Sequence, residues 1–253
     1  MANIKAGERR TLDIMRRDAV AASNAWANTL ARKRVKVVRD ILKELRDFHE
    51  VRMWEMYFDS HFTEPYLPSW YQGIITTTAL PNIAVTAKQL TGRADSLDKN
   101  LFVASINDFA ERRAGSQISI VSGTVKDDVR RILRSSLDAD PNIGVERLAR
   151  AVAQGVSDLA LWQARRIAQT EAMVALGEAG NEAARSLGIA FTKTWCCSGL
   201  TNSRDTHLAM DGVTVDEDEP FVFPDCEMQY PHDPSGTAAE VINCACAVIR
   251  RPK

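Results

Sequence analysis

The chain lacks cysteine over its first 195 residues, has no long apolar run, and carries almost no net charge. Its five cysteines all lie between Cys196 and Cys246, and this clustered, odd number argues against a disulfide-stapled secreted protein. No run approaches the ~20 apolar residues that span a bilayer, so no membrane segment is expected. A formal net charge of -1 gives no general attraction for nucleic acids.

Motifs with well-understood reactions are also missing. The sequence has no glycine-rich phosphate loop, no serine nucleophile elbow and no H-E-x-x-H helix. Catalysis has little direct support from the residues, so the sequence predicts that the chain is not an enzyme.

Proline and glycine are absent from residues 8–58, where apolar residues such as Val38, Ile41 and Leu45, followed by Phe48, recur at helical spacing. We expect a long amphipathic helix that packs either on later helices of the chain or on a partner. A dense basic cluster within it offers candidate phosphate contacts, with a solvated face as the alternative; its members are Arg32, Lys33, Arg34 and Lys36.

Residues 60–82 contain three prolines and several aromatic residues. Because proline lacks a backbone donor and restricts the residue before it, this stretch is predicted to be an extended, aromatic linker. Helices resume after Pro81. One is predicted to begin at an N-cap, Thr124, and another, which starts at Val145, is predicted to stop at Gly155.

The period changes after Gly188, from helical spacing to alternation. Short strands are predicted around residues 189–195, 212–215, 220–223 and 245–250. The expected fold is mainly α over the N-terminal two-thirds, with a small α+β unit at the C-terminus. We divide it into a helical arm with its linker (1–82), a helical body (83–188) and the α+β unit (189–253).

Several short motifs follow one another in the second half of the chain: R-I-A-Q-T-E from Arg166, R-D-T-H-L-A-M-D-G from Arg204, Y-P-H-D-P from Tyr230 and N-C-A-C from Asn243. Together, in this order and spacing, they resemble the phage Mu protein F family of minor head proteins, also called head morphogenesis proteins. The resemblance covers about half the chain. Gln169 and Ala245 stand where the family usually has arginine.

The resemblance implies a low-copy virion component that lies inside the capsid near the portal. Such a protein joins the particle in the host cytoplasm during assembly and acts in DNA packaging or ejection. Its implied partners are the portal protein, the scaffold or major capsid protein, and packaged DNA. In this family the variable first half is similar to a helical arm that docks on the portal or scaffold.

The motif residues have a structural and a catalytic interpretation. The set comprises Arg166, Thr170, Glu171, Asn181, Trp195, Arg204, His207, Asp211, Gly212 and Asn243. In the structural interpretation the charged members form a buried polar clamp between the helical body and the α+β unit, and Asp211–Gly212 makes a turn with glycine at positive φ. In a nuclease-like interpretation His207 is a general base beside a metal-bound aspartate. We favour the structural interpretation.

The closing cysteines could bind a metal. Cys244 and Cys246 are one residue apart, and alternate residues of a strand face the same side. Zinc takes four cysteine or histidine ligands in a tetrahedron, and Cys197 and His207 are the best candidates to complete the set. Cys226 and His232 are reserves. The alternative is that the thiols are small buried apolar groups without metal.

Two further functions remain open at this point. A metal-dependent nuclease or toxin-like effector is suggested because similar modules also occur fused to toxin domains. A DNA-binding module would use the basic cluster of residues 32–36, and its affinity should fall steeply with salt.

Overall fold

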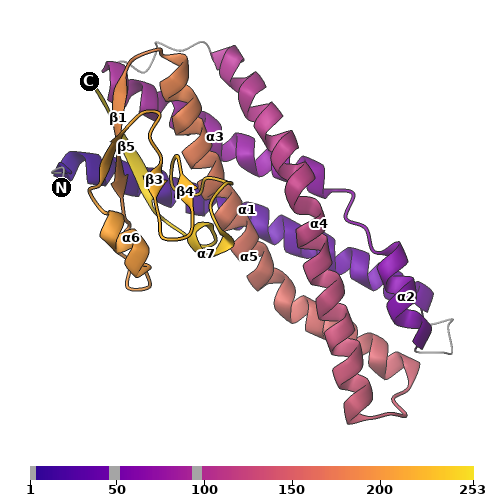
Figure 1. The fold of residues 1–253 in the computed structure, drawn as a ribbon. Helices are drawn as coiled ribbons and strands as arrows, with labels where there is room; N and C mark the ends of the chain where they lie inside the picture. The colour runs from indigo at the N-terminus through magenta and orange to yellow at the C-terminus, as the bar shows by residue number, and fades with distance from the viewer. Residues whose placement is uncertain (1–3, 46–51, 93–98) are drawn as a thin grey trace. The chain divides into compact units, whose positions relative to one another are not determined.

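The computed structural model describes residues 4–45, 52–92 and 99–253. It is mainly helical and has a small C-terminal strand region, which confirms the expected fold class (Figure 1). The elements are α1 (Ala6–Leu45), α2 (Arg52–His61), α3 (Leu67–Thr91), α4 (Lys99–Ala139), α5 (Val145–Ser186), β1 (Phe191–Cys196), α6 (Asp205–Met210), β2 (Thr214–Asp216), β3 (Phe221–Val222), β4 (Glu227–Met228), α7 (Ala238–Val241) and β5 (Ala247–Pro252).

The chain forms two compact units, and each is built from separated segments. Unit 1 comprises residues 1–24, 72–110 and 166–253, whereas unit 2 comprises residues 25–71 and 111–165. Long-range packing therefore joins the start of the chain to its end within unit 1. The predicted division at residue 82 falls inside α3. The assignment of residues 1–82 to docking stays a prediction.

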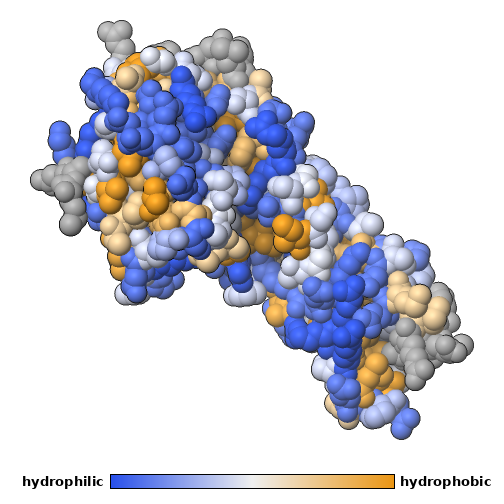
Figure 2. All heavy atoms as spheres, viewed as in Figure 1, coloured by the Kyte–Doolittle hydropathy of each residue, from blue (hydrophilic) through white to orange (hydrophobic). Residues whose placement is uncertain are grey.

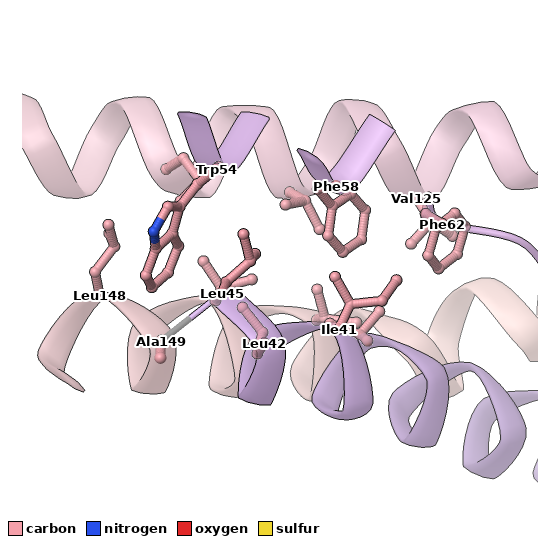
Figure 3. Close-up of a cluster of buried hydrophobic side chains, with 14 residues drawn as sticks. Ile41, Leu42, Leu45, Trp54, Phe58, Phe62, Val125, Leu148 and Ala149 are labelled. Carbon is pink, nitrogen blue, oxygen red and sulfur yellow. The ribbon is translucent and has the colours of Figure 1, made fainter. Parts of the chain in front are cut away.

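Aromatic side chains of α2 and of Phe62, the residue that follows it, organise the core of unit 2. Trp54, Phe58 and Phe62 point between α1, α4 and α5 and pack on apolar side chains such as Ile41 and Leu45 (Figure 3). Burying each such side chain contributes about 1.5–3 kcal/mol. The apolar spacing of residues 38–45 thus serves packing within the chain. The predicted stripe member Phe48 lies outside the described residues.

A fully buried ion pair also lies in unit 2, and it corrects one predicted phosphate contact. Arg34 Nε and Nη2 donate to the two Glu64 carboxylate oxygens at 2.9 and 3.1 Å, and both side chains are almost inaccessible. Tyr66 and Ser122 donate further hydrogen bonds to Glu64. Arg34 cannot reach a phosphate, because its guanidinium is committed to this carboxylate.

The predicted extended linker is wrong over most of its length. Residues 67–91 form α3, which begins just before Pro68 and continues through Pro81. Proline is tolerated in the first turn of a helix, where its missing N–H has no partner anyway, and this explains Pro68. Pro81 removes one helical hydrogen bond. Burial of flanking apolar residues, among them Ile74 and Ala79, offsets that cost.

Two predicted helix boundaries are also wrong. Thr124 lies inside the 41-residue α4, where its hydroxyl donates to the carbonyl of Ile120 four residues earlier. Gly155 lies inside the 42-residue α5. A Cβ at Gly155 would come within 2.6 Å of Ile132 Cδ1, so this glycine allows close packing of α4 and α5 rather than ending a helix.

The strands form two small antiparallel sheets in unit 1. The first has the order β2-β1-β5, and the second pairs β3 with β4. All four predicted strand regions are confirmed, while β4 was not foreseen. Gly188 and Gly212 have φ of 61° and 83°, as expected of glycines that end a helix and form a turn.

Polar side chains cover most of the face seen in Figure 2, with smaller apolar spots between them. Among the described residues, no helix has the length and apolar character needed to cross a bilayer.

Candidate metal centre

Local structure brings three predicted ligands together in unit 1. His207 lies on the single-turn helix α6, which follows β1 and ends at the Asp211–Gly212 turn. Cys244 and Cys246 lie in the connection between α7 and β5. Asn243, just before them, has a positive φ of 57° and turns the chain toward the histidine.

The three ligand atoms form one tight, buried group. His207 Nδ1 lies 3.3 Å from Cys246 Sγ and 3.5 Å from Cys244 Sγ. All three atoms lie within 4.8 Å of one another, and all three residues are buried. One imidazole nitrogen and two sulfurs facing a common point form a soft donor set of the kind that zinc prefers.

The other ring nitrogen of His207 faces a carboxylate. His207 Nε2 lies 2.7 Å from Glu240 Oε2, although the N–H direction is not well aligned with that oxygen. Thr206 Oγ1 donates to both Glu240 oxygens, at 3.2 and 3.0 Å. In metal sites a carboxylate on the distant nitrogen fixes the tautomer that leaves the first nitrogen free to bind metal. The Glu240 carboxylate beside Nε2 would favour the tautomer that leaves Nδ1, which faces the two sulfurs, without a proton.

The two thiols differ in their electrostatic surroundings. Burial tends to raise the pKa of Cys244, but hydrogen bonds from the Cys246 thiol and backbone, with the positive charge of Arg204, lower it overall. The pKa of Cys246 is raised by the Cys244 side chain and by burial. Cys244 is thus the more readily deprotonated of the pair, and thiolate is the form that binds metal.

The predicted fourth ligand lies near this group but outside its tight triad. Cys197 is buried in the same cluster as the two other cysteines, and burial together with the Cys246 thiol raises its pKa. Cys226, a reserve ligand, is only partly buried at the edge of the cluster. His232, the other reserve, is buried with Nε2 3.3 Å from the backbone oxygen of Cys246.

Aromatic rings enclose the centre. Trp195 and Phe223 each lie 5.6 Å, centroid to centroid, from the His207 ring, and Phe221 packs on Trp195 at 5.1 Å. Such a wall excludes water and strengthens every polar contact inside it. Trp195, a member of the predicted set, therefore shapes the centre.

The remaining predicted residues have different surroundings. Arg204 donates to the backbone oxygen of Ile242, and Thr170 Oγ1 accepts the Asn243 N–H at 3.4 Å. Glu171 and Asn181 are buried on α5, but Arg166 is exposed, so the predicted burial of Arg166 is wrong.

The start of α1 contacts this region, which the sequence did not reveal. Asp211 Oδ2 accepts from Arg9 at 3.0 Å, and its Oδ1 accepts the Cys197 N–H at 2.9 Å. Arg16 donates to the Cys196 backbone oxygen at 2.9 Å. Glu8 accepts two hydrogen bonds from Arg251 of β5, at 2.8 and 2.7 Å. No local pattern signals contacts across 180 or more residues of chain.

Comparison with known proteins gives one partial match. Over 90 residues the chain is 38% identical to NAD(+)--arginine ADP-ribosyltransferase EFV of Enterococcus faecalis, and these residues are 34% of this chain and 18% of that protein. The chain thus spans less than a fifth of the relative it matches. No family model matches the chain. No solved structure matches it either.

This match corrects one sequence-based prediction. The absence of familiar catalytic motifs led to the prediction that the chain is not an enzyme, yet a third of it resembles part of a named transferase. Motif absence is a weak argument, because catalytic residues are recognised by their geometry rather than by local sequence.

Proposed function

We propose that this chain is a minor head protein of a tailed phage, with a C-terminal unit built around a zinc ion. It would lie inside the capsid near the portal and act in assembly and in DNA packaging or ejection. One observation supports this most: Trp195, His207, Cys244 and Cys246, drawn from motifs spread over 52 residues, converge on one buried centre. Two of the motifs that carry the resemblance, R-D-T-H-L-A-M-D-G and N-C-A-C, thus meet at one buried centre.

The protein's place in the virion can be tested on particles of the phage or prophage that encodes the chain. Mass spectrometry of purified DNA-filled heads should detect the chain at low copy number. Deleting its gene should lower the yield of DNA-filled heads. Normal, infectious particles without the chain would contradict the proposal.

The proposed zinc ligands are His207 Nδ1, Cys244, Cys246 and, as the fourth, Cys197. When bound, zinc would add folding free energy to the C-terminal unit, because the unfolded chain has no preformed site. Elemental analysis of protein purified under reducing conditions should give about one zinc per chain. Chelation should lower the melting temperature of the wild type, but not that of a Cys244→Ser/Cys246→Ser variant. If the purified protein contains no metal and its melting temperature does not respond to chelator, the thiols are packed as buried apolar groups without metal.

The basic residues that remain exposed on α1 support a contact with packaged DNA. Arg32 and Lys36 line an open groove in unit 2, together with Arg39 and Lys43. Lys33 lies over the Tyr66 ring at 5.2 Å. Binding of a DNA duplex should weaken steeply with salt, and an Arg32→Ala/Lys36→Ala variant should show a shallower salt slope. Salt-independent binding would exclude phosphate contacts.

The transferase match supports a second candidate, a role in ADP-ribosyl transfer by a toxin-like protein. Incubation with labelled NAD⁺ and an arginine-containing acceptor tests it directly. Label on the acceptor would favour this candidate. If the acceptor carries no label and the chain is present in DNA-filled heads, the minor head protein is favoured.

A further inference from the structure

A buried arginine of unit 1 takes no part in the candidate metal centre. Arg250 of β5 is 5% exposed and pairs across the sheet with Lys193 of β1. Its side chain extends toward α5, where Gly180 leaves room for it. A Cβ at that glycine would lie 2.6 Å from Arg250 Nη1.

The guanidinium of Arg250 is incompletely satisfied by the protein. Within the described part of the chain, its buried Nε and Nη2 atoms find no hydrogen-bond acceptor. Glu178 acts on Arg250 only through its charge, because this carboxylate accepts its hydrogen bond from the Tyr230 hydroxyl. A buried cation without a bonded counterion is costly, so such a group normally has a partner.

Charges of both signs act on these groups, since Glu178 attracts Arg250, and Asp218 and Asp233 attract Lys193. Arg185 repels Arg250 and, like Arg250, repels Lys193, whose side chain is also fully buried. Burial lowers the pKa of Arg250 to about 10, so the guanidinium stays charged at neutral pH. The charged guanidinium nitrogens that lack an acceptor within the described residues therefore favour an occupant that carries negative charge and accepts hydrogen bonds.

A small cavity has Arg250 in its wall. It measures ≈ 20 Å³ and is lined by Thr86, Gln89, Gly177, Tyr230, His232 and Arg250, among others. A site of about this size holds one occupant of the size of a water molecule, because one water needs roughly 10–15 Å³ on the same measure. This volume favours a single small occupant over phosphate, carboxylates and other polyatomic anions.

We propose that Arg250 binds a single monatomic anion of the chloride class in this cavity, between α5 and β5 of unit 1. The anion accepts hydrogen bonds from Arg250 Nε and Nη2 and neutralises the buried charge. It also links Arg250 to the Y-P-H-D-P segment, whose Tyr230 and His232 line the same cavity. The occupant thereby stabilises the contact between helix and sheet.

Thermal unfolding of the full chain at constant ionic strength tests this proposal. Sodium chloride or bromide is exchanged against sodium gluconate, whose anion is too large to enter. The melting temperature should rise by about 3–6 °C for each tenfold increase in chloride above its dissociation constant. An equal melting temperature in the two salts would overturn the proposal.

Two variants and a matched control make the test specific. Arg250→Met removes the cation, and Gly180→Ala displaces the guanidinium while leaving its charge in place. Both should lose the chloride dependence. Arg251→Met, the neighbouring residue that binds Glu8 instead, should keep it. If Arg250→Met does not fold, the Gly180→Ala variant still tests the proposal. A chloride-dependent melting temperature in Gly180→Ala would contradict the site.

A bromide-soaked crystal of the wild type provides a direct observation. Anomalous density is expected within hydrogen-bond distance of Arg250 Nε and Nη2. A water molecule at these nitrogens, with bromide only on the surface, would overturn the proposal.

Discussion

The two units differ in whether their buried polar groups find partners within the chain. In unit 2, Arg34 and Glu64 bind each other through two hydrogen bonds. Tyr66 and Ser122 donate further hydrogen bonds to the Glu64 carboxylate. In unit 1, the donor atoms of His207, Cys244 and Cys246 face one another around a common point. For Arg250, in the same unit, two nitrogens find no acceptor among the residues that the structure describes.

This contrast distinguishes the structural polar network of unit 2 from the candidate ligand sites of unit 1. A polar network that the chain itself completes fixes one packing arrangement and needs nothing else. Groups that converge without completing one another are stable only when a further species joins them. The difference predicts that unit 2 responds mainly to mutation, whereas unit 1 also responds to metal and anion.

The largest expected effect is in unit 2. Arg34→Met leaves the Glu64 carboxylate buried without its cation, which should lower the free energy of unfolding by about 3–5 kcal/mol. The double variant Arg34→Met/Glu64→Met should recover much of this loss. Urea denaturation measures both. Arg32→Met, an exposed arginine on the same helix, should stay within about 0.5 kcal/mol of wild type. A loss of similar size in this control would show that the pair is not special.

The next effect is a pH dependence in unit 1. Burial lowers the pKa of Lys193 to about 8, below its ordinary value of 10.5. Between these values the unfolded chain binds more protons than the folded chain, so the free energy of unfolding rises with pH, by about 2–3 kcal/mol. Lys193→Met should remove this rise, and exposed Lys36→Met should retain it. Equal slopes in wild type and Lys193→Met would contradict the prediction.

A smaller effect concerns the orientation of a metal ligand. Glu240→Gln replaces the carboxylate on His207 Nε2 by a neutral amide, which should weaken zinc affinity by about 10–100-fold. Competition with a chromophoric chelator measures the affinity. Exposed Glu227→Gln is the matched control and should bind zinc like the wild type. If Glu240→Gln also keeps wild-type affinity, Glu240 does not orient the histidine.

The smallest effect is at the contact between α1 and β5. Glu8→Gln removes the charge of the bond to Arg251, at an expected cost of up to ~1 kcal/mol at pH 7. The Arg251 hydrogen bond holds the pKa of Glu8 below 4.5, so its contribution is present above that pH. It is lost as pH falls through the lowered folded-state pKa. Chemical denaturation should show that the difference in the free energy of unfolding between wild type and Glu8→Gln is smaller at pH 3 than at pH 7. A constant difference would point to lost packing instead.

Sequence patterns succeeded where the interactions are local. Alternation identified β1, and glycine at positive φ was placed correctly at Gly212. They failed at Pro81, Thr124 and Gly155, each of which lies inside a long helix. Intrinsic propensities at such positions amount to a few kcal/mol at most, and burial of flanking apolar residues outweighs them.

The residues of the candidate site likewise fall into those that the sequence selected and those that it missed. Residue type and spacing were enough to select His207, Cys244 and Cys246, because soft ligands are rare in the chain and clustered near its end. Glu240 and Arg9 carried no such signal, since a single glutamate or arginine is common on any surface. Their roles depend on which segments meet in three dimensions.

The sequence by itself thus determined the fold class, the strand-bearing C-terminal unit and the residue types available to bind a metal. Only the tertiary structure decided that Arg34 is a buried partner of Glu64 and that the first turns of α1 pack beside β5. It also brought Arg250 to a cavity wall. The physical reason is that patterns of period 2 or 3.6 report which face of an element is buried, whereas the partner of a charged side chain depends on contacts between residues far apart in the chain.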